Sequence, residues 1–185
     1  MQTVYILLTR TGTRVSKMIH FIKGGEFTHV SISLLPRTDS FMSFARRKIN
    51  NPLCGGFIYE DTNKGIFSLY KNSHCKLYAI DLSDDAYYRI KDYITNTHIR
   101  HYKQSGYNYL GCFMLTFGIY IKRKYKRTCS QFVAYTLNSS DEIELPKSPI
   151  QMLPNDFLKI KKLKMIYDGD IFGCNFENAM CLFQK

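Results

Sequence analysis

The chain has 185 residues, of which 45% are hydrophobic and 22% are charged, and its formal net charge is +11 at pH 7. These proportions are typical of a folded globular domain and exclude an intrinsically disordered chain, and the length predicts a single domain over residues 1–185. No segment reaches the roughly 18 apolar residues that a membrane-spanning helix needs, and residues 1–8 lack the basic start of a secretory signal. We therefore expect a cytoplasmic protein whose six cysteines are thiols.

Short apolar segments separated by turns make up the first half of the chain. Residues 4–9 are apolar and β-branched, which predicts a buried strand, and residues 14–22 carry apolar side chains at helical spacing, which predicts a short amphipathic helix. Residues 28–35 alternate between apolar and polar, which predicts a strand with one buried face and places His29 on the other face. We also expect strands at residues 41–45, 65–70 and 75–82, and a loop at residues 50–56.

Helices dominate the second half. Ser83 is a predicted N-cap for a helix over residues 84–97, which has two acids in its first turn. Residues 110–121 are apolar on every side, which predicts either a buried helix or a buried strand, and residues 129–137 predict a helix packed inward. A loop at 138–149, a helical turn at 154–158 and a last strand at 163–167 complete the chain. Because strands and helices do not strictly alternate, we predict an α+β fold with a mostly antiparallel sheet packed against helices.

Among the cysteines, Cys129 has the surroundings that a nucleophile needs. A helix N-terminus, a nearby histidine and nearby cations each stabilise the reactive thiolate. Cys129 begins a helix-forming run, and the basic residues 122–127 precede it. The other five cysteines lie in a loop, at a strand start, in an apolar run or in the C-terminal tail. We therefore predict that Cys129 is a nucleophile at a helix N-terminus.

A base must deprotonate such a thiol, and His29 is the candidate among five histidines. It stands at the start of a predicted strand and projects from the face opposite Val30 and Ile32. His98 and His101 share a helical face, but no carboxylate or cysteine accompanies them at ligand spacing, so no metal site is expected.

Several segments together resemble a known family of enzymes. The histidine strand THVSI (residues 28–32) and the cysteine helix TCSQFV (128–133) are similar to the two catalytic motifs of circularly permuted papain-like hydrolases. These are the YiiX-like members of the NlpC group, which are related to lecithin:retinol acyltransferase. His29 precedes Cys129 by 100 residues, which is the permuted order. Weaker likenesses support the comparison, at YNYLG (107–111), MSFARR (42–47), SP (148–149) and PNDF (154–157).

The resemblance implies a cysteine hydrolase or acyltransferase that forms an acyl-enzyme on Cys129, with His29 as base and no cofactor. Its substrate would be an amide, ester or thioester in a peptide, a cell-wall fragment or a lipid acyl group. Relatives orient the histidine with a glutamate on the following strand, but residues 41–45 contain no acid. We favour Ser43 slightly over Glu60 for this role, and Tyr5 is a candidate donor to the oxyanion.

Two alternatives stay open, one because of the positive charge and one because residues 41–45 contain no acid to orient His29. Basic runs at residues 122–127 and 159–164 favour anionic partners, such as an anionic surface or a nucleic acid. A nucleic-acid partner is not expected, because zinc-finger spacing and RNP-like aromatic motifs are absent from the sequence. The second alternative is a non-catalytic module of the same fold that binds lipids or cell-wall fragments. The sequence leaves the substrate, the acyl acceptor and the oligomeric state open.

Overall fold

A six-stranded antiparallel sheet forms the centre of the protein. The computed structural model describes the chain except for residues 11–24, 49–50, 71–72, 116, 172–177 and 181–185. The strands are β1 (Gln2–Arg10), β2 (His29–Ser33), β3 (Phe41–Lys48), β4 (Asn51–Glu60), β5 (His74–Leu82) and β8 (Lys164–Asp170), in the spatial order β4-β3-β2-β1-β5-β8. A short parallel pair, β6 (Gly106–Tyr107) and β7 (Lys126–Arg127), forms a separate two-stranded ladder. The predicted α+β class with a mostly antiparallel sheet is confirmed.

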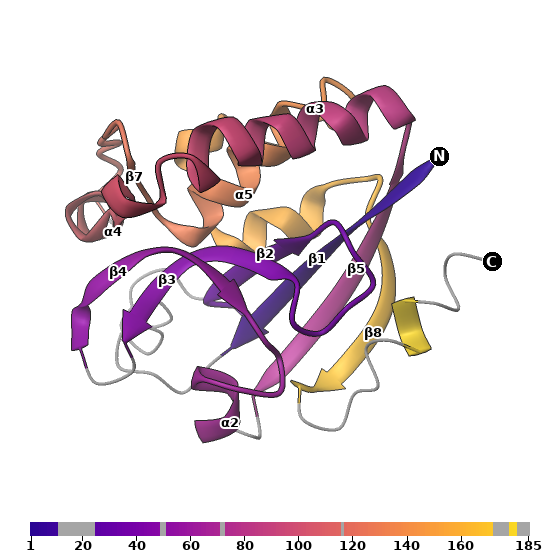
Figure 1. The fold of residues 1–185 in the computed structure, drawn as a ribbon, viewed down its shortest axis with the longest axis horizontal. Helices are drawn as coiled ribbons and strands as arrows, with labels where there is room; N and C mark the ends of the chain where they lie inside the picture. The colour runs from indigo at the N-terminus through magenta and orange to yellow at the C-terminus, as the bar shows by residue number, and fades with distance from the viewer. Residues whose placement is uncertain (11–24, 49–50, 71–72, 116, 172–177, 181–185) are drawn as a thin grey trace.

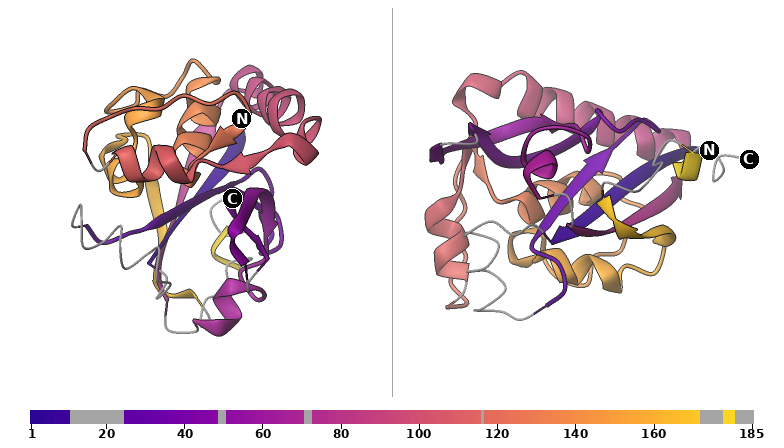
Figure 2. Two further views of the ribbon diagram at one scale, coloured as in Figure 1. Left: turned by 90° about the vertical axis from the view of Figure 1, so that its left-hand side faces the viewer. Right: turned by 90° about the horizontal axis from the view of Figure 1, so that it is seen from below.

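Helices pack on both sides of the sheet. The helices α3 (Asp84–Ile94) and α5 (Cys129–Asn138) lie together over one face (Figures 1 and 2). The shorter helices are α2 (Ile66–Leu69) and α4 (Tyr109–Leu115), and a π-helix (Thr95–Ile99) extends α3. Three 3-10 segments follow at Tyr102–Gln104, Pro149–Gln151 and Pro154–Lys159. None of the helices in the described ranges combines the length and the apolar character that crossing a bilayer requires.

The side chains of the central strand β1 alternate between two hydrophobic cores, one on each face of the sheet. Val4, Ile6 and Leu8 join the core beneath α3 and α5. Tyr5 and Leu7 join a second core on the other face of the sheet, whose further members include Phe41, Phe67, Leu77, Ile171 and Met180. Because both faces of β1 are covered and side chains alternate along a strand, residues 4–8 form an unbroken apolar run rather than an alternating pattern.

Most of the predicted elements are present. The strands at 4–9, 28–35, 41–45, 75–82 and 163–167, the helices at 84–97 and 129–137, and the turn at 154–158 all have counterparts. Ser83 caps α3 by accepting a hydrogen bond from the backbone N–H of Ala86 at 3.2 Å. The helix predicted over residues 14–22 lies outside the described residues.

The loop predicted at residues 50–56 is wrong, because residues 51–56 belong to strand β4 and residue 50 lies outside the described residues. Gly55 and Gly56, which suggested a loop, instead allow other segments to approach the strand closely. A Cβ atom on Gly55 would stand 2.7 Å from the Cβ of Tyr107, and one on Gly56 would stand 2.7 Å from the carbonyl oxygen of Ser105. The glycines therefore report close approach of another backbone, which is a recognised use of glycine inside strands.

Two other predictions are also wrong. Residues 66–69 form helix α2 rather than a strand, and only Phe67 on this helix is buried. Residues 110–115 form most of α4, in agreement with the helix alternative, but the burial expected on every side is wrong, since Leu110, Phe113 and Phe117 are 49–67% exposed. Hydrophobicity alone predicted burial on every side, whereas the tertiary structure buries Gly111 and Leu115 and leaves the other face of α4 on the surface.

Candidate active site

Cys129 is the first residue of helix α5, as the sequence predicts. Thr128 is the N-cap: its hydroxyl accepts from the backbone N–H of Gln131, and the Gln131 side chain accepts from the N–H of Thr128, both at 3.2 Å. This reciprocal capping fixes the first turn of the helix. Cys129 itself is 4% exposed, so its thiol lies in a largely desolvated position at the positive end of the helix dipole.

His29 and Glu60 form a hydrogen-bonded pair from two different strands. The Nε2 atom of His29 lies 2.9 Å from one carboxylate oxygen of Glu60 and 3.2 Å from the other. The side chains are 15% and 5% exposed, respectively. His29 begins β2, whose apolar residues pack against α5, and Glu60 ends β4. The sheet and the helix thus bring together residues from three distant parts of the chain.

The electrostatic surroundings of His29 favour its protonated form. Burial disfavours the imidazolium, but the negative charge of Glu60 and the side chain of Cys129 favour it more strongly, through charge and through hydrogen bonds. The pKa of His29 is therefore raised well above its ordinary value of 6.5. A histidine held between a carboxylate and a thiol is suited to carry the proton that a cysteine nucleophile must lose.

Tyr107 and Cys112 complete the surroundings of Cys129. Tyr107 pairs with Arg127 in the parallel β6–β7 pair, two residues before Cys129. Burial raises the pKa of the Tyr107 hydroxyl well above its usual value, and negative charge at Cys112 and Cys129 raises it further. Burial and the charge of Cys129 also raise the pKa of the Cys112 thiol to about 11, although a hydrogen bond with Tyr107 opposes this. At neutral pH, Tyr107 is thus a hydrogen-bond donor and Cys112 an unreactive thiol.

Ser43 and Tyr5, for which the sequence suggested roles beside His29 and at the oxyanion, both lie away from this arrangement. Glu60, rather than the slightly favoured Ser43, contacts the His29 ring. Ser43 is fully buried on β3, and its hydroxyl has no hydrogen-bond partner among the described residues. Tyr5 lies in the second core, with its hydroxyl 3.4 Å from the carbonyl oxygen of Met180. A tyrosine that does lie near Cys129 is Tyr107. The sequence pointed to it only through the likeness of residues 107–111 to a segment of the permuted papain-like hydrolases.

Comparison of the chain with protein-family models, with curated proteins and with solved structures finds no match. The interpretation of the site therefore rests on its own geometry.

No cluster of three or more His, Cys, Asp or Glu side chains that could hold a metal ion occurs in the described part of the chain. His98, which the sequence analysis considered as a ligand, lies instead among aromatic rings. It stacks on Phe57 and meets Phe44 and Phe132 edge to face, with centroids 4.9–5.9 Å apart. His101 instead contacts Tyr125.

Replacing Glu60 by glutamine tests the electrostatic part of this description. An opposite charge within hydrogen-bonding distance shifts a pKa by about 1–3 units. We therefore expect Glu60→Gln to lower the pKa of His29 by about one unit or more, as measured by NMR titration of the imidazole C–H resonances. Asp61→Asn is the matched control, because Asp61 pairs with Lys64 rather than with His29. An unchanged His29 titration in Glu60→Gln would contradict the assignment of Glu60 as its partner.

Proposed function

We propose that the chain is a cysteine hydrolase with a permuted papain-like fold, in which Cys129 attacks an acyl carbonyl and His29 is the base. The observation that carries this proposal is the line of contacts from Glu60 to His29 to Cys129, with the thiol at the start of a capped helix. A carboxylate that orients a histidine toward a nucleophile is the recurring constellation of acyl-transfer enzymes. It also weighs against a non-catalytic binding module, which does not need a carboxylate behind the histidine.

The chemistry begins with the proton of the Cys129 thiol. Because Nε2 of His29 is held by Glu60, Nδ1 is the nitrogen left to accept that proton. The thiolate then attacks the carbonyl carbon of an amide, ester or thioester, and the carbonyl electrons move onto its oxygen. As the tetrahedral intermediate collapses, His29 returns the proton to the leaving group, and an acyl-enzyme remains on Cys129. Water, activated by the neutral imidazole, hydrolyses this thioester and restores the thiol.

Two donors are available to the oxyanion. One is the backbone N–H of Cys129, which as the first residue of α5 has no carbonyl partner within the helix. The other is the hydroxyl of Tyr107, which keeps its proton at neutral pH and lies within electrostatic range of Cys129. We assign this role to Tyr107 in place of Tyr5. Glu60 is a positioning residue, because it acts on the substrate only through His29.

The resemblance of residues 28–32 and 128–133 to the two catalytic motifs of YiiX-like enzymes supports the same conclusion. It implies a peptide, a cell-wall amide or a lipid acyl group as substrate. Neither a metal nor an organic cofactor has a step in this mechanism, since the thiolate, the imidazole and the two donors supply the chemistry.

The proposal is tested by the rate at which iodoacetamide labels each cysteine of the folded protein between pH 5 and pH 9, read by mass spectrometry. An ordinary thiol, with a pKa of about 8.5, is almost wholly protonated at pH 6. We expect Cys129 to label rapidly at pH 6 in the wild type and to lose this reactivity in His29→Ala. Cys112 is the internal control, since its pKa of about 11 predicts slow labelling throughout.

The opposite outcome is equally informative. If Cys129 labels no faster than Cys112 at pH 6, and His29→Ala changes nothing, the thiol is not activated. The catalytic proposal would then fail, and the fold would be better interpreted as a binding module.

A further inference from the structure

An exposed apolar cluster projects from α4 and the turn after it. We call it the α4 tip, and it comprises Leu110, Phe113, Phe117, Ile119 and Tyr120, which are between 45% and 67% exposed. The rings of Phe113 and Phe117 meet edge to face at 5.3 Å. The turn folds back on the helix, because the backbone N–H groups of Phe117 and Ile119 both donate to the carbonyl of Met114. Large exposed apolar patches mark sites of interaction rather than ordinary surface.

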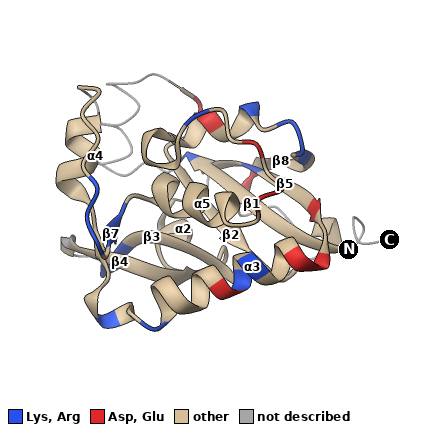
Figure 3. Cartoon of the chain, turned by 90° about the horizontal axis from the view of Figure 1, so that it is seen from above, with Lys and Arg blue, Asp and Glu red and all other residues tan. Residues whose placement is uncertain are grey.

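Positive charge surrounds this tip without compensating acids. No Asp or Glu occurs between Asp92 and Asp141, whereas the same stretch contains seven Lys and Arg residues. Lys122, Arg123 and Lys124 are exposed immediately after the tip. In Figure 3, blue residues follow the chain from α4 toward β7, α4 itself is uncharged, and the red residues lie on α3 and toward β5 and β8.

The second basic run differs from the first in its ion pairs. Lys159 lies 3.8 Å from Asp156, Lys162 lies 3.6 Å from Glu142, and Lys164 lies 3.0 Å from Asp81. The exposed cations that follow the α4 tip have no carboxylate partner within the described ranges. Cations without a carboxylate partner among the described residues therefore lie next to the exposed apolar side chains of the α4 tip.

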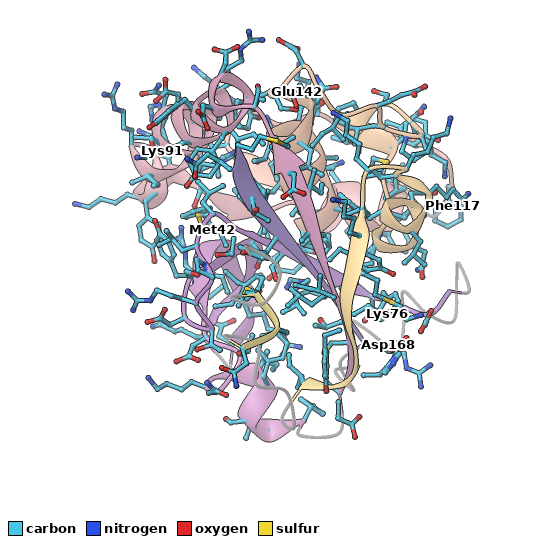
Figure 4. The ribbon with its side chains drawn as sticks, turned by 90° about the vertical axis from the view of Figure 1, so that its right-hand side faces the viewer. Met42, Lys76, Lys91, Phe117, Glu142 and Asp168 are labelled. Carbon is cyan, nitrogen blue, oxygen red and sulfur yellow. The ribbon has the colours of Figure 1, made fainter. Side chains whose placement is uncertain are left out.

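We propose that the α4 tip and residues 122–126 of the first basic run form a docking surface for a lipid bilayer with anionic headgroups. Aromatic and aliphatic side chains enter the boundary between headgroups and acyl chains, and lysines and arginines beside them contact the anionic lipids. Phe117 lies at the edge of the molecule in Figure 4, and its side chain is 67% exposed. Because α4 has only seven residues, it lies in the interface and does not cross the bilayer.

The mixture of residues favours lipid over nucleic acid as the partner. Bases of a single strand stack on aromatic rings, and the aliphatic side chains of Leu110 and Ile119 offer no such platform. Both suit an apolar acyl environment. The docking does not depend on catalysis by Cys129. Since Cys112 on α4 lies within electrostatic range of Cys129, a bilayer bound at the tip would be a neighbour of the candidate active site.

Flotation of the full chain with lipid vesicles tests this inference. The wild type is expected to float with vesicles of phosphatidylcholine and phosphatidylserine, to float poorly with phosphatidylcholine alone, and to dissociate as salt is added. Each Lys122→Gln or Lys124→Gln change should weaken binding about fivefold. Phe117→Ser should weaken it at unchanged net charge. The matched controls are Lys161→Gln with Lys162→Gln in the second basic run, and Leu69→Ser on α2, where Leu69 is 61% exposed.

Three results would overturn the proposal, provided that circular dichroism shows the variants to be folded. The first is equal flotation with and without phosphatidylserine. The second is wild-type binding by both the Phe117 and the lysine variants. The third is tighter binding to a single-stranded oligonucleotide than to the anionic vesicles, with the same dependence on Phe117, which would assign the surface to nucleic acid.

Discussion

Replacing Cys129 by alanine is expected to abolish burst release of p-nitrophenol from p-nitrophenyl acetate and to reduce its steady hydrolysis by about a thousandfold or more. Removal of a nucleophile that acts as a unit with its base leaves only the catalysis that binding and oxyanion donors provide. In the proposed mechanism this unit is the thiol at the start of α5 together with His29 and Glu60.

Matched variants separate this expectation from nonspecific ester cleavage. Cys112→Ala should retain the burst, because the raised pKa of that thiol keeps it protonated at neutral pH. In the wild type, mass spectrometry after acid quench should locate the acetyl group on Cys129. His29→Gln should reduce the rate by about a hundredfold or more, since it removes the proposed general base and retains a side chain of similar size. An acetyl group found on surface lysines in all variants would contradict the proposed mechanism.

The unfolding free energy is expected to fall by about 2 kcal/mol between pH 7 and pH 5 because of His98 alone. His98 is 4% exposed, and burial, together with the positive charge of Arg127, lowers its pKa from 6.5 to about 3. In the unfolded chain His98 takes up a proton near pH 6.5, whereas in the folded protein it stays neutral to about pH 3. The unfolded state therefore binds more protons across this range, so its contribution to stability is present above pH 6.5 and is lost as the pH falls.

Urea unfolding of the wild type and of His98→Phe measures this contribution as a difference. The difference in unfolding free energy between the two proteins should change by about 2 kcal/mol from pH 7 to pH 5. Any constant cost of the larger phenylalanine ring cancels in this change. His29 does not disturb the comparison, because it is present in both proteins. Its raised pKa also acts in the opposite direction: its stabilisation is lost as the pH rises above 6.5. If the difference in unfolding free energy between wild type and His98→Phe does not change with pH, His98 becomes protonated in the folded protein between pH 7 and pH 5, and the expectation is wrong.

Local patterns in the sequence were sufficient for the elements that carry the candidate nucleophile and base. Alternation along residues 28–35 predicts strand β2, and residues 129–137 predict α5 with Cys129 in its first turn. These signals are local, because strand and helix periodicity and helix capping depend on residues within one or two turns of each other. For the same reason, Ser83 was recognised as the cap of α3.

Local patterns failed where contacts between distant segments decide the outcome. The glycines of β4 are there because Tyr107 and Ser105 pass close to the strand, which no property of residues 50–56 reveals. The apolar run at 110–121 was expected to be buried, since hydrophobicity gives the tendency to leave water but not the place where a chain is covered.

The sequence by itself determined that the chain forms an α+β fold, that Cys129 begins a helix, and that His29 begins a strand. Only the tertiary structure decided which residues stand beside them: Glu60 rather than Ser43 at His29, and Tyr107 rather than Tyr5 near Cys129. The physical reason is that hydrogen bonds and charges act over a few ångströms in space. Glu60 reaches His29 from the far end of β4, and Tyr107 reaches Cys129 through the β6–β7 pair, across separations at which sequence position predicts no contact.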